Sequence, residues 1–239
     1  MDNEIQKPSG MKKIVILTGA GISAESGLKT FRDTDGLWEG YHISEVATPE
    51  AWRANPEFVQ EFYNERRKLI MEAAPNKGHE ALVKLEEKYQ VQIITQNIDD
   101  LHERAGSSNV LHLHGVITLA QSDADASLTY PISGWKLGFD QYCVHNKPLR
   151  PHVVWFGEAV PNMEPAIQIC RQADIFMVIG TSLQVYPAAG LLEYVPRVAR
   201  KYVIDPKVPP IRNKSLVTIV EQPATVGVLM VVEELLKDV

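Results

Sequence analysis

Short runs of aliphatic and β-branched residues recur along the chain, and most of them are separated by helix-like stretches. Such runs are typical of strands buried on both faces, and their alternation with helices is typical of a parallel α/β sheet. The predicted strands are residues 13–18, 91–95, 175–179, 202–204 and 216–220. The predicted helices are residues 49–73, 77–88, 164–172, 187–200 and 224–237. We therefore expect an α/β fold, a Rossmann-like parallel sheet with helices on both faces plus a smaller inserted lobe.

Two stretches interrupt this alternation. Residues 31–67 insert helical material, and residues 116–152 are rich in Ser, Asp, Gly and Pro without a clear period. In the second stretch we expect an irregular lobe or a mobile hairpin. The expected division of the chain is a main domain over 11–31, 76–115 and 153–239, a small lobe over 32–75 and 116–152, and a flexible N-terminus over 1–10.

Composition and charge exclude several classes of protein. Of the 239 residues, 45% are hydrophobic and 23% are charged, as in soluble globular proteins rather than disordered ones. No apolar run approaches the roughly 18 residues of a membrane span, and the polar N-terminus lacks a signal-peptide core, so we expect a cytoplasmic protein. The two cysteines agree with a reducing compartment. A net charge of −6 disfavours general binding of nucleic acids.

A glycine turn follows the first predicted strand, with the sequence Gly19-Ala20-Gly21-Ile22-Ser23. Glycines at this place let backbone N–H groups approach a pyrophosphate, which the next helix N-terminus also attracts. The dinucleotide pattern is met only in its alanine form, with Ala24 at the last place. An ordinary tight turn between strand and helix therefore stays open as an alternative.

Five further blocks stand in a fixed order along the chain. They are T-F-R-D with G-L-W at 30–38, T-Q-N-I-D-D-L-H at 95–102, H-L-H-G at 112–115, V-W-F-G-E at 154–158 and G-T-S-L at 180–183. Together with the glycine turn, these blocks resemble the sirtuin family from about Ile14 to the C-terminal helix, with the exception of residues 116–152. The resemblance implies an enzyme that uses NAD as a co-substrate to remove acyl groups from lysine side chains of proteins or peptides, releasing nicotinamide and O-acyl-ADP-ribose.

The resemblance also implies which residues carry the chemistry. His114 takes the position of the general base, a task that suits a histidine titrating near neutral pH. Periodicity alone leaves His112 open, because both would share a face if the segment is a strand. Asn97 takes the position that orders ribose and water, and Asp99 takes the position that holds the nicotinamide carboxamide. A helix N-cap at either residue is the plainer alternative.

The NAD-binding residues implied by the resemblance lie mostly after predicted strands, in the main domain. Phe31 would shield the reacting ribose face, and the guanidinium of Arg32 would suit the diphosphate, although a core residue and a surface charge are plainer readings. The full set is Gly19, Ala20, Gly21, Ser23, Phe31, Arg32, Gln96, Asn97, Ile98, Asp99, Gly180, Thr181, Ser182, Asp205 and Ala224.

Two groups of residues are expected to bind the acylated substrate. The segment Val153, Val154, Phe156, Gly157 and Glu158 resembles the one that takes the peptide as an added strand, although a routine edge or core strand is equally compatible.

Tyr63 and Arg66, three apart on one helix face, match the Tyr-x-x-Arg of the sirtuin branch that removes succinyl and malonyl groups. Their hydroxyl and guanidinium groups suit a carboxylate. A solvated face with a Glu61 or Glu65 ion pair is the alternative.

The chain departs from most sirtuins in lacking the paired cysteines of a structural zinc site. Between His114 and the W-F-G-E block, the cysteine and histidine residues are Cys143, His145 and His152, which is fewer thiolates than the usual structural zinc site has. A site formed by these three residues and a carboxylate is the alternative, but we expect no zinc. We expect apolar packing to hold the small lobe instead. The candidate core residues are Leu128, Tyr130, Trp135, Phe139 and Tyr142.

Two other functions stay open on the same fold. The first is NAD hydrolysis or ADP-ribosyl transfer, because the same pocket would activate the same glycosidic bond. The second, and the weaker, is a non-catalytic NAD-sensing module, since Asn97, Asp99 and His114 occur together.

Overall fold

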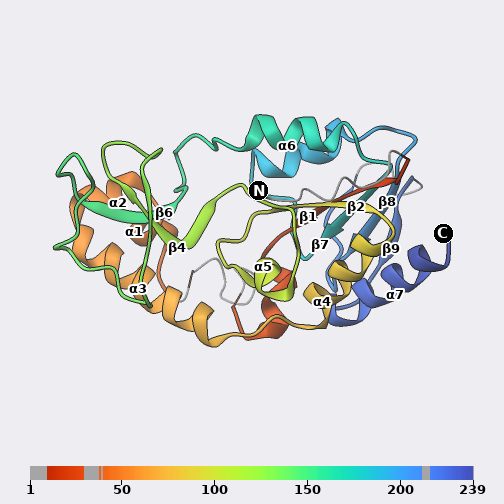
Figure 1. The fold of residues 1–239 in the computed structure, drawn as a ribbon, viewed down its shortest axis with the longest axis horizontal. Helices are drawn as coiled ribbons and strands as arrows, with labels where there is room; N and C mark the ends of the chain where they lie inside the picture. Colours follow the sequence, from red (N-terminus) through yellow and green to blue (C-terminus); the bar gives the residue numbers. More distant parts are fainter. Residues whose placement is uncertain (1–9, 30–37, 39, 212–215, 239) are drawn as a thin grey trace, which may run out of the picture.

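The computed structural model describes residues 10–29, 38, 40–211 and 216–238. Within these ranges the chain forms a large α/β part and a smaller part beside it, which lie at opposite ends of the long axis (Figure 1). Of the described helices, none is long and apolar enough to cross a bilayer.

The large part is built on a six-stranded sheet with the order β3-β2-β1-β7-β8-β9, and every pairing in it is parallel. The strands are β1 (Lys13–Thr18), β2 (Gln90–Thr95), β3 (Val110–His112), β7 (Ile175–Ile179), β8 (Arg200–Ile204) and β9 (Thr218–Val220). Strand β7 is buried along its whole length, as expected of an aliphatic run covered on both faces.

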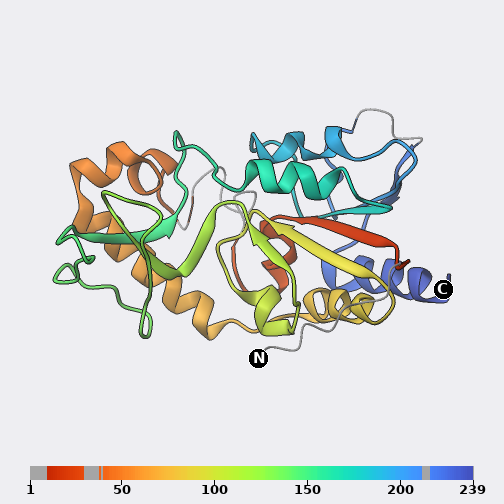
Figure 2. The ribbon, with the colours of Figure 1, turned by 45° about the horizontal axis from the view of Figure 1, so that its top comes forward.

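Helices cover both faces of this sheet (Figure 2). The side chains of β1 alternate between the two faces. Ile14 and Ile16 pack with α4 (Lys77–Lys84) and α7 (Ala224–Lys237). Val15 and Leu17 pack with α6 (Met163–Cys170) and the 3-10 helix η4 (Ala188–Tyr194). The expected α/β architecture is confirmed.

In the residues that the structure describes, the smaller part combines three helices with a three-stranded antiparallel sheet of order β5-β4-β6. Its helices are α1 (Ile43–Val46), α2 (Pro49–Ala54) and α3 (Pro56–Glu72), and its strands are β4 (Gly115–Ser122), β5 (Thr129–Pro131) and β6 (Leu149–Val153). Three short elements lie between the two sheets, namely the 3-10 helices η1 (Ala20–Ile22) and η2 (Ala24–Ser26) and the helix α5 (Leu101–Ala105).

Several predicted elements differ from the observed ones. The helix expected over 49–73 is two helices, because Asn55 leaves the helical conformation and its side chain accepts from the Phe58 amide, with Pro56 as the first residue of α3. The helix expected over 187–200 is only the 3-10 helix η4, and the one over 77–88 ends at Lys84 before the 3-10 helix η3 (Leu85–Glu87). The stretch 116–152 holds most of an antiparallel sheet rather than irregular chain.

The core of the antiparallel sheet is formed only in part by the expected residues, because Tyr130 packs against it while Leu128 and Trp135 are half-buried outside it. Phe139 and Tyr142 are exposed, at 43% and 54%. The buried cluster is instead formed by Ala120, Leu137, Cys143 and Leu149, with Tyr130 and Ile132 packed against it.

A row of buried polar side chains on α3 forms hydrogen bonds with the backbone of Ile117, Trp135 and Leu137. Asn64 donates to the Leu137 carbonyl at 3.2 Å and accepts from the Leu137 amide at 2.9 Å, while Gln60 donates to the same carbonyl at 3.1 Å. Arg67, with no exposed surface, donates to the carbonyls of Ile117 at 2.6 Å and Trp135 at 2.8 Å. Gln60, Asn64 and Arg67 are spaced four and three apart, so they lie on one face of the helix. We call them the α3 polar row.

Candidate active site

A cavity of about 1020 Å³ opens at the carboxyl ends of the parallel strands. Gly19 follows β1, Gln96 follows β2 and Gly180 follows β7, and all three residues line it. This edge is where open α/β sheets bind ligands, because the strand-to-helix turns converge there. The other wall comes from the smaller part, through Tyr63 on α3 and Val153 at the end of β6.

The cavity gathers the predicted site residues that the structure describes. Phe31 and Arg32 lie outside the described residues. The lining includes Gly19, Ala20, Gly21, Ser23, Tyr63, Arg66, Gln96, Asn97, Ile98, Asp99, His114, Val153, Val154, Phe156, Gly157, Glu158, Gly180, Thr181, Ser182, Asp205 and Ala224.

Two glycine turns interlock at the centre of the sheet edge. The Gly21 amide donates to the Gly180 carbonyl at 2.8 Å. A Cβ on Gly21 would meet the Gly180 Cα at 2.6 Å, and a Cβ on Gly180, which has a φ of +61°, would meet the Ile22 amide nitrogen at 2.4 Å. Glycine is therefore required here for the turns to pack, and the same absence of side chains leaves a backbone-lined cradle on the cavity wall.

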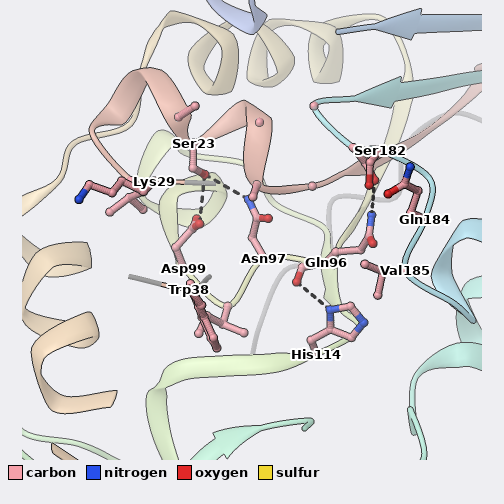
Figure 3. A pocket seen from close by; sticks show the side chains of 18 of the residues that line it. Ser23, Lys29, Trp38, Gln96, Asn97, Asp99, His114, Ser182, Gln184 and Val185 are labelled. Carbon is pink, nitrogen blue, oxygen red and sulfur yellow. Dashed lines mark hydrogen bonds between the residues drawn. The ribbon is translucent and has the colours of Figure 1, made fainter. Parts of the chain in front are cut away.

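Ser23 joins two polar side chains from the loop after β2 (Figure 3). Asn97 Nδ2 donates to Ser23 Oγ at 3.1 Å, and Ser23 Oγ donates to Asp99 Oδ2 at 3.1 Å. Asp99 Oδ1 also accepts from the amide of Leu101, the first residue of α5, at 3.2 Å, so this carboxylate contacts the start of the helix and lines the cavity, although the N-cap residue is Asp100. Burial raises the pKa of Asp99, although the bonds from Leu101 and Ser23 oppose the rise.

His114 lies in the connection between β3 and β4 and faces the cavity. Its Nδ1 is 2.9 Å from the Gln96 carbonyl oxygen (Figure 3). A carbonyl only accepts, so Nδ1 carries the proton and Nε2 keeps the basic lone pair. Burial lowers the pKa of His114, with the Gln96 carbonyl opposing, and this keeps the ring neutral near pH 7.

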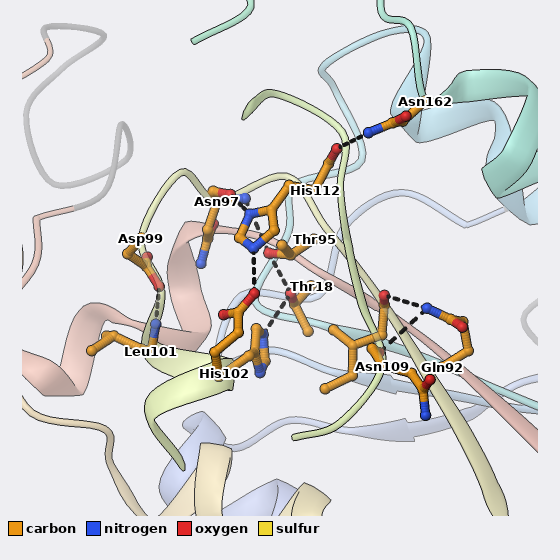
Figure 4. A network of polar contacts seen from close by, with 12 residues as sticks. Thr18, Gln92, Thr95, Asn97, Asp99, Leu101, His102, Asn109, His112 and Asn162 are labelled. Carbon is orange, nitrogen blue, oxygen red and sulfur yellow. Dashed lines mark hydrogen bonds and ion pairs between the residues drawn. The ribbon is translucent and has the colours of Figure 1, made fainter. Parts of the chain in front are cut away.

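His112 does not line the cavity. It ends β3, and its ring lies between the Asn97 carbonyl and the Glu103 carboxylate (Figure 4). The two histidines therefore do not share one strand face, because the strand ends before His114. Of the pair, His114 is the one placed to meet a ligand in the cavity.

Tyr63 and Arg66 line the end of the cavity in the smaller part, and both are buried, at 0% and 8% exposed. The solvated helix face is therefore wrong for these two residues. The Tyr63 hydroxyl accepts from Trp155 Nε1 at 2.9 Å, and the Arg66 guanidinium carbon lies 5.7 Å from the Trp38 ring centroid. Burial raises the pKa of Tyr63, so its hydroxyl keeps its proton at any physiological pH.

The segment expected to form a substrate-binding strand is only partly a strand. Val153 ends β6, and the chain then turns, with the Glu158 amide bonded to the Trp155 carbonyl at 3.0 Å. Within this turn the Val154 amide donates to the His114 carbonyl at 2.9 Å. The backbone of this segment thus borders the same cavity as His114.

Two tryptophans in the cavity wall had no role in the sequence prediction. Trp38 and Trp155 both belong to the recognised blocks, so the signal was present in the motifs. Arg150 stacks on Trp155, with its guanidinium carbon 3.9 Å from the ring centroid, and its Nη2 donates to Glu158 at 2.7 Å. Lining residues 208–210, after β8, carried no such signal.

Within the described ranges there is no cluster of three or more His, Cys, Asp or Glu side chains arranged to hold a metal ion. Cys143 packs in the core of the antiparallel sheet, while His152 bonds to Gln121 at 2.8 Å. His145 is exposed.

The sheet edge, the glycine cradle and the polar groups of the loop after β2 together define a dinucleotide-binding protein with the Rossmann-like arrangement. The sequence model of the Sir2 family matches residues 19–187. The chain belongs to this family, the sirtuins, and the resemblance seen in its motifs is confirmed.

Curated relatives and solved structures agree with this assignment. A protein of Helicobacter pylori (strain ATCC 700392 / 26695) is 55% identical over 199 residues, covering 82% of this chain and 86% of that one. A protein of Bacteroides thetaiotaomicron is 49% identical over 223 residues, covering 91% and 95%. Both are named NAD-dependent protein deacylase.

Two solved structures illustrate the match in fold. A Sir2 homolog in complex with NAD superposes with a TM-score of 0.86 at 36% identity, covering 96% of this chain and 91% of that one. Sir2Tm bound to a propionylated peptide superposes with a TM-score of 0.74 at 31% identity, covering 94% of each.

Proposed function

We propose that this chain is an NAD-dependent protein-lysine deacylase that releases nicotinamide and O-acyl-ADP-ribose. The observation that carries the proposal is the convergence of His114, Asn97 and Asp99 on one cavity beside the glycine cradle. The names of the curated relatives and the NAD and acyl-peptide complexes of the solved homologues support it.

The residues of the cavity fit NAD. The cradle at Gly19 and Gly21 is closed to any Cβ, as expected where backbone must approach a pyrophosphate. Asp99 offers a buried carboxylate that suits a carboxamide NH₂, and Asn97 offers an amide beside it. When bound, NAD would supply the electrophilic ribose carbon that the acyl oxygen attacks as nicotinamide leaves, and the ribose hydroxyl that finally carries the acyl group.

The protein's own groups would then have three tasks. His114 Nε2 takes a proton, because Nδ1 is committed to the Gln96 carbonyl and burial keeps the ring neutral. Asn97 and Asp99, joined through Ser23, orient the polar groups of the substrate. Walls from both parts of the molecule restrict water, which matters because water would compete with the acyl group.

Nicotinamide release with and without a succinylated lysine peptide tests this function. Release that depends on the peptide, and that falls at least about a hundredfold in His114→Gln, is the expected result, since general base catalysis contributes about 10²–10⁴-fold. Release without peptide would identify an NAD glycohydrolase. No release in either case, with NAD still bound, would identify a sensing module.

For the acyl group we propose an acidic chain such as succinyl or malonyl, held by Tyr63 and Arg66. Trp155 already donates to the Tyr63 oxygen, so the hydroxyl proton is directed to another acceptor, and the cavity beside it is where a carboxylate would lie. The guanidinium of Arg66 supplies the matching charge.

Arg66→Met should lower kcat/KM for succinyl-lysine peptide by at least about tenfold, as expected for loss of a charge-assisted hydrogen bond, and should leave acetyl-lysine peptide little changed. Arg53→Met is the matched control, because Arg53 lies exposed on α2, with a side chain 70% accessible. A higher kcat/KM for acetyl than for succinyl peptide, unaltered in Arg66→Met, would contradict the acidic preference.

The proposal includes a cytoplasmic protein that needs no structural zinc. Cys143 packing with Leu137 and Leu149 supports the use of this thiol as a core residue. Elemental analysis that found one zinc per chain would contradict the second point, and fractionation of the source cells tests the first.

A further inference from the structure

His112 lies two residues before His114, is 8% exposed and has an acceptor at each ring nitrogen. Its Nδ1 is 3.0 Å from the Asn97 carbonyl oxygen, and its Nε2 is 2.7 Å from Glu103 Oε1 (Figure 4). A carbonyl and an ionised carboxylate can only accept, so both nitrogens must donate. The geometry therefore requires the doubly protonated, positively charged ring.

The groups around His112 favour that charge. Glu103 faces it from α5, and Asp99 faces it from the loop after β2. The other titratable neighbours are His102 on α5 and His152 on β6, and burial lowers the pKa of both, so they stay neutral. Burial by itself would lower the pKa of His112, but the bond and charge of Glu103, with the Asn97 carbonyl and Asp99, outweigh it and raise the pKa.

The same contacts fix the backbone that carries Asn97. The Asn97 carbonyl bonds to His112, while its amide donates to Thr95 Oγ1 at 3.0 Å. With its two flanking peptide groups held in this way, Asn97 directs its side chain to Ser23, which in turn bonds to Asp99. A positive ring behind the loop also favours the ionised form of the buried Asp99.

We infer that His112 and Glu103 form a charged clamp that positions Asn97 and Asp99 in the cavity, so His112 is a positioning residue rather than the base. This inference rests on the proposed function only in its enzymatic test, which uses the proposed reaction as the assay. The clamp itself is a property of the folded chain, with or without a substrate.

The ring state is measured directly. In NMR titration of the wild-type protein, the His112 ring is expected to stay protonated at pH 7 and to lose its proton above the ordinary histidine value of about 6.5. Glu103→Gln keeps the size of the side chain and one acceptor oxygen but removes the charge. It should lower the His112 titration midpoint by about one pH unit, as expected when a close opposite charge is lost.

The enzymatic consequence follows the same titration. For nicotinamide release, Glu103→Gln should move the alkaline limb of the kcat/KM profile for NAD to lower pH by the same amount. The ratio of the activity at pH 6.5 to the activity at pH 8 should therefore rise above the wild-type ratio, by up to about tenfold. His112→Gln should lower activity throughout and abolish that limb. A side chain with a merely structural role would change the rate without moving the limb.

Glu86→Gln is the matched control. The Glu86 carboxylate accepts from the amide and the hydroxyl of Ser108, which lies in the connection between α5 and β3. The Glu86→Gln variant should leave the pH profile unchanged. A neutral His112 ring at pH 7 in the wild type overturns the clamp, even if Glu103→Gln fails to fold. An unchanged His112 titration in Glu103→Gln overturns it as well. A wild-type protein that releases no nicotinamide would instead reject the proposed function, while the ring titration still decides the clamp.

Discussion

Arg67→Met tests the α3 polar row, which ties the antiparallel sheet to α3. Arg67 donates to the Ile117 and Trp135 carbonyls and to Asn64 Oδ1, the last at 2.8 Å. Hydrogen bonds from a charged donor contribute about 1.5–3 kcal/mol each. Burial of the methionine side chain recovers about 2 kcal/mol.

At the low end, three such bonds contribute about 4.5 kcal/mol, and subtracting the recovered ~2 kcal/mol leaves an expected loss in unfolding free energy of about 2.5–3 kcal/mol. The low end applies because burial lowers the pKa of Arg67 to about 10, which shows that desolvation of the cation offsets part of the gain. For a chain of this size the loss corresponds to a fall in Tm of about 6–12 °C. Urea denaturation at pH 7 measures the first quantity and calorimetry the second.

Arg53→Met provides the comparison, since the exposed Arg53–Glu50 pair should change stability by less than about 0.5 kcal/mol. If Arg67→Met costs less than about 1 kcal/mol, the row does not hold the sheet. The Ile117 amide also donates to the Ile98 carbonyl at 2.9 Å, so the variant should weaken NAD binding together with stability.

Three further outcomes are expected. Gly180→Ala should lower Tm and weaken NAD binding at least tenfold by titration calorimetry, because the added Cβ would meet the Ile22 amide nitrogen at 2.4 Å; unchanged affinity would contradict the interlocked turns. Trp155→Phe removes the donor to Tyr63, and a loss of about 1 kcal/mol should lower kcat/KM for succinyl peptide about fivefold more than for acetyl peptide. Because burial lowers the pKa of His114, its base form is lost only as pH falls below about 6.5, so the acid limb of the kcat profile should lie below that value; an acid limb starting above it would exclude His114 as the base.

The large sheet and its ligand edge could be predicted because buried parallel strands leave a direct trace in the sequence. β1 and β7 are covered on both faces, so each is a continuous aliphatic run followed by a glycine turn. Polar residues directly after such runs, such as Gln96 and Asn97, then converge by the geometry of the parallel sheet alone.

The smaller part could not be predicted in the same way, because its buried positions are partly polar. The antiparallel sheet has buried polar residues, namely Gln121, Ser122 and Arg150. Hydrogen bonds such as the one from Arg150 to Glu158 make their burial possible, but polar residues at buried positions break the apolar and polar alternation that normally marks a strand. The break at Asn55 was readable from the Asn-Pro pair, but the helical residues on both sides masked it.

The choice between His112 and His114 depends on where one strand ends. Alternation places both on one face only if the strand continues through His114, but β3 ends at His112. Gly115 then takes a φ of +82°, and a Cβ there would meet the His152 carbonyl oxygen at 2.1 Å. This contact between the neighbouring strands β4 and β6 depends on residues distant in sequence, so no local pattern reveals it.

The strand order places the first strand of the chain in the middle of the sheet. During synthesis this strand must therefore wait for a neighbour that is made much later. β1 gains β2 as a neighbour once residue 95 is made, but β7 is complete only at residue 179, which is 84 residues later. At about 5–20 residues per second, that interval lasts about 4–17 s. During it an aliphatic strand has one edge unpaired, which is a template for contact with other nascent chains. Truncated products ending before β7 should therefore aggregate or be held by chaperones.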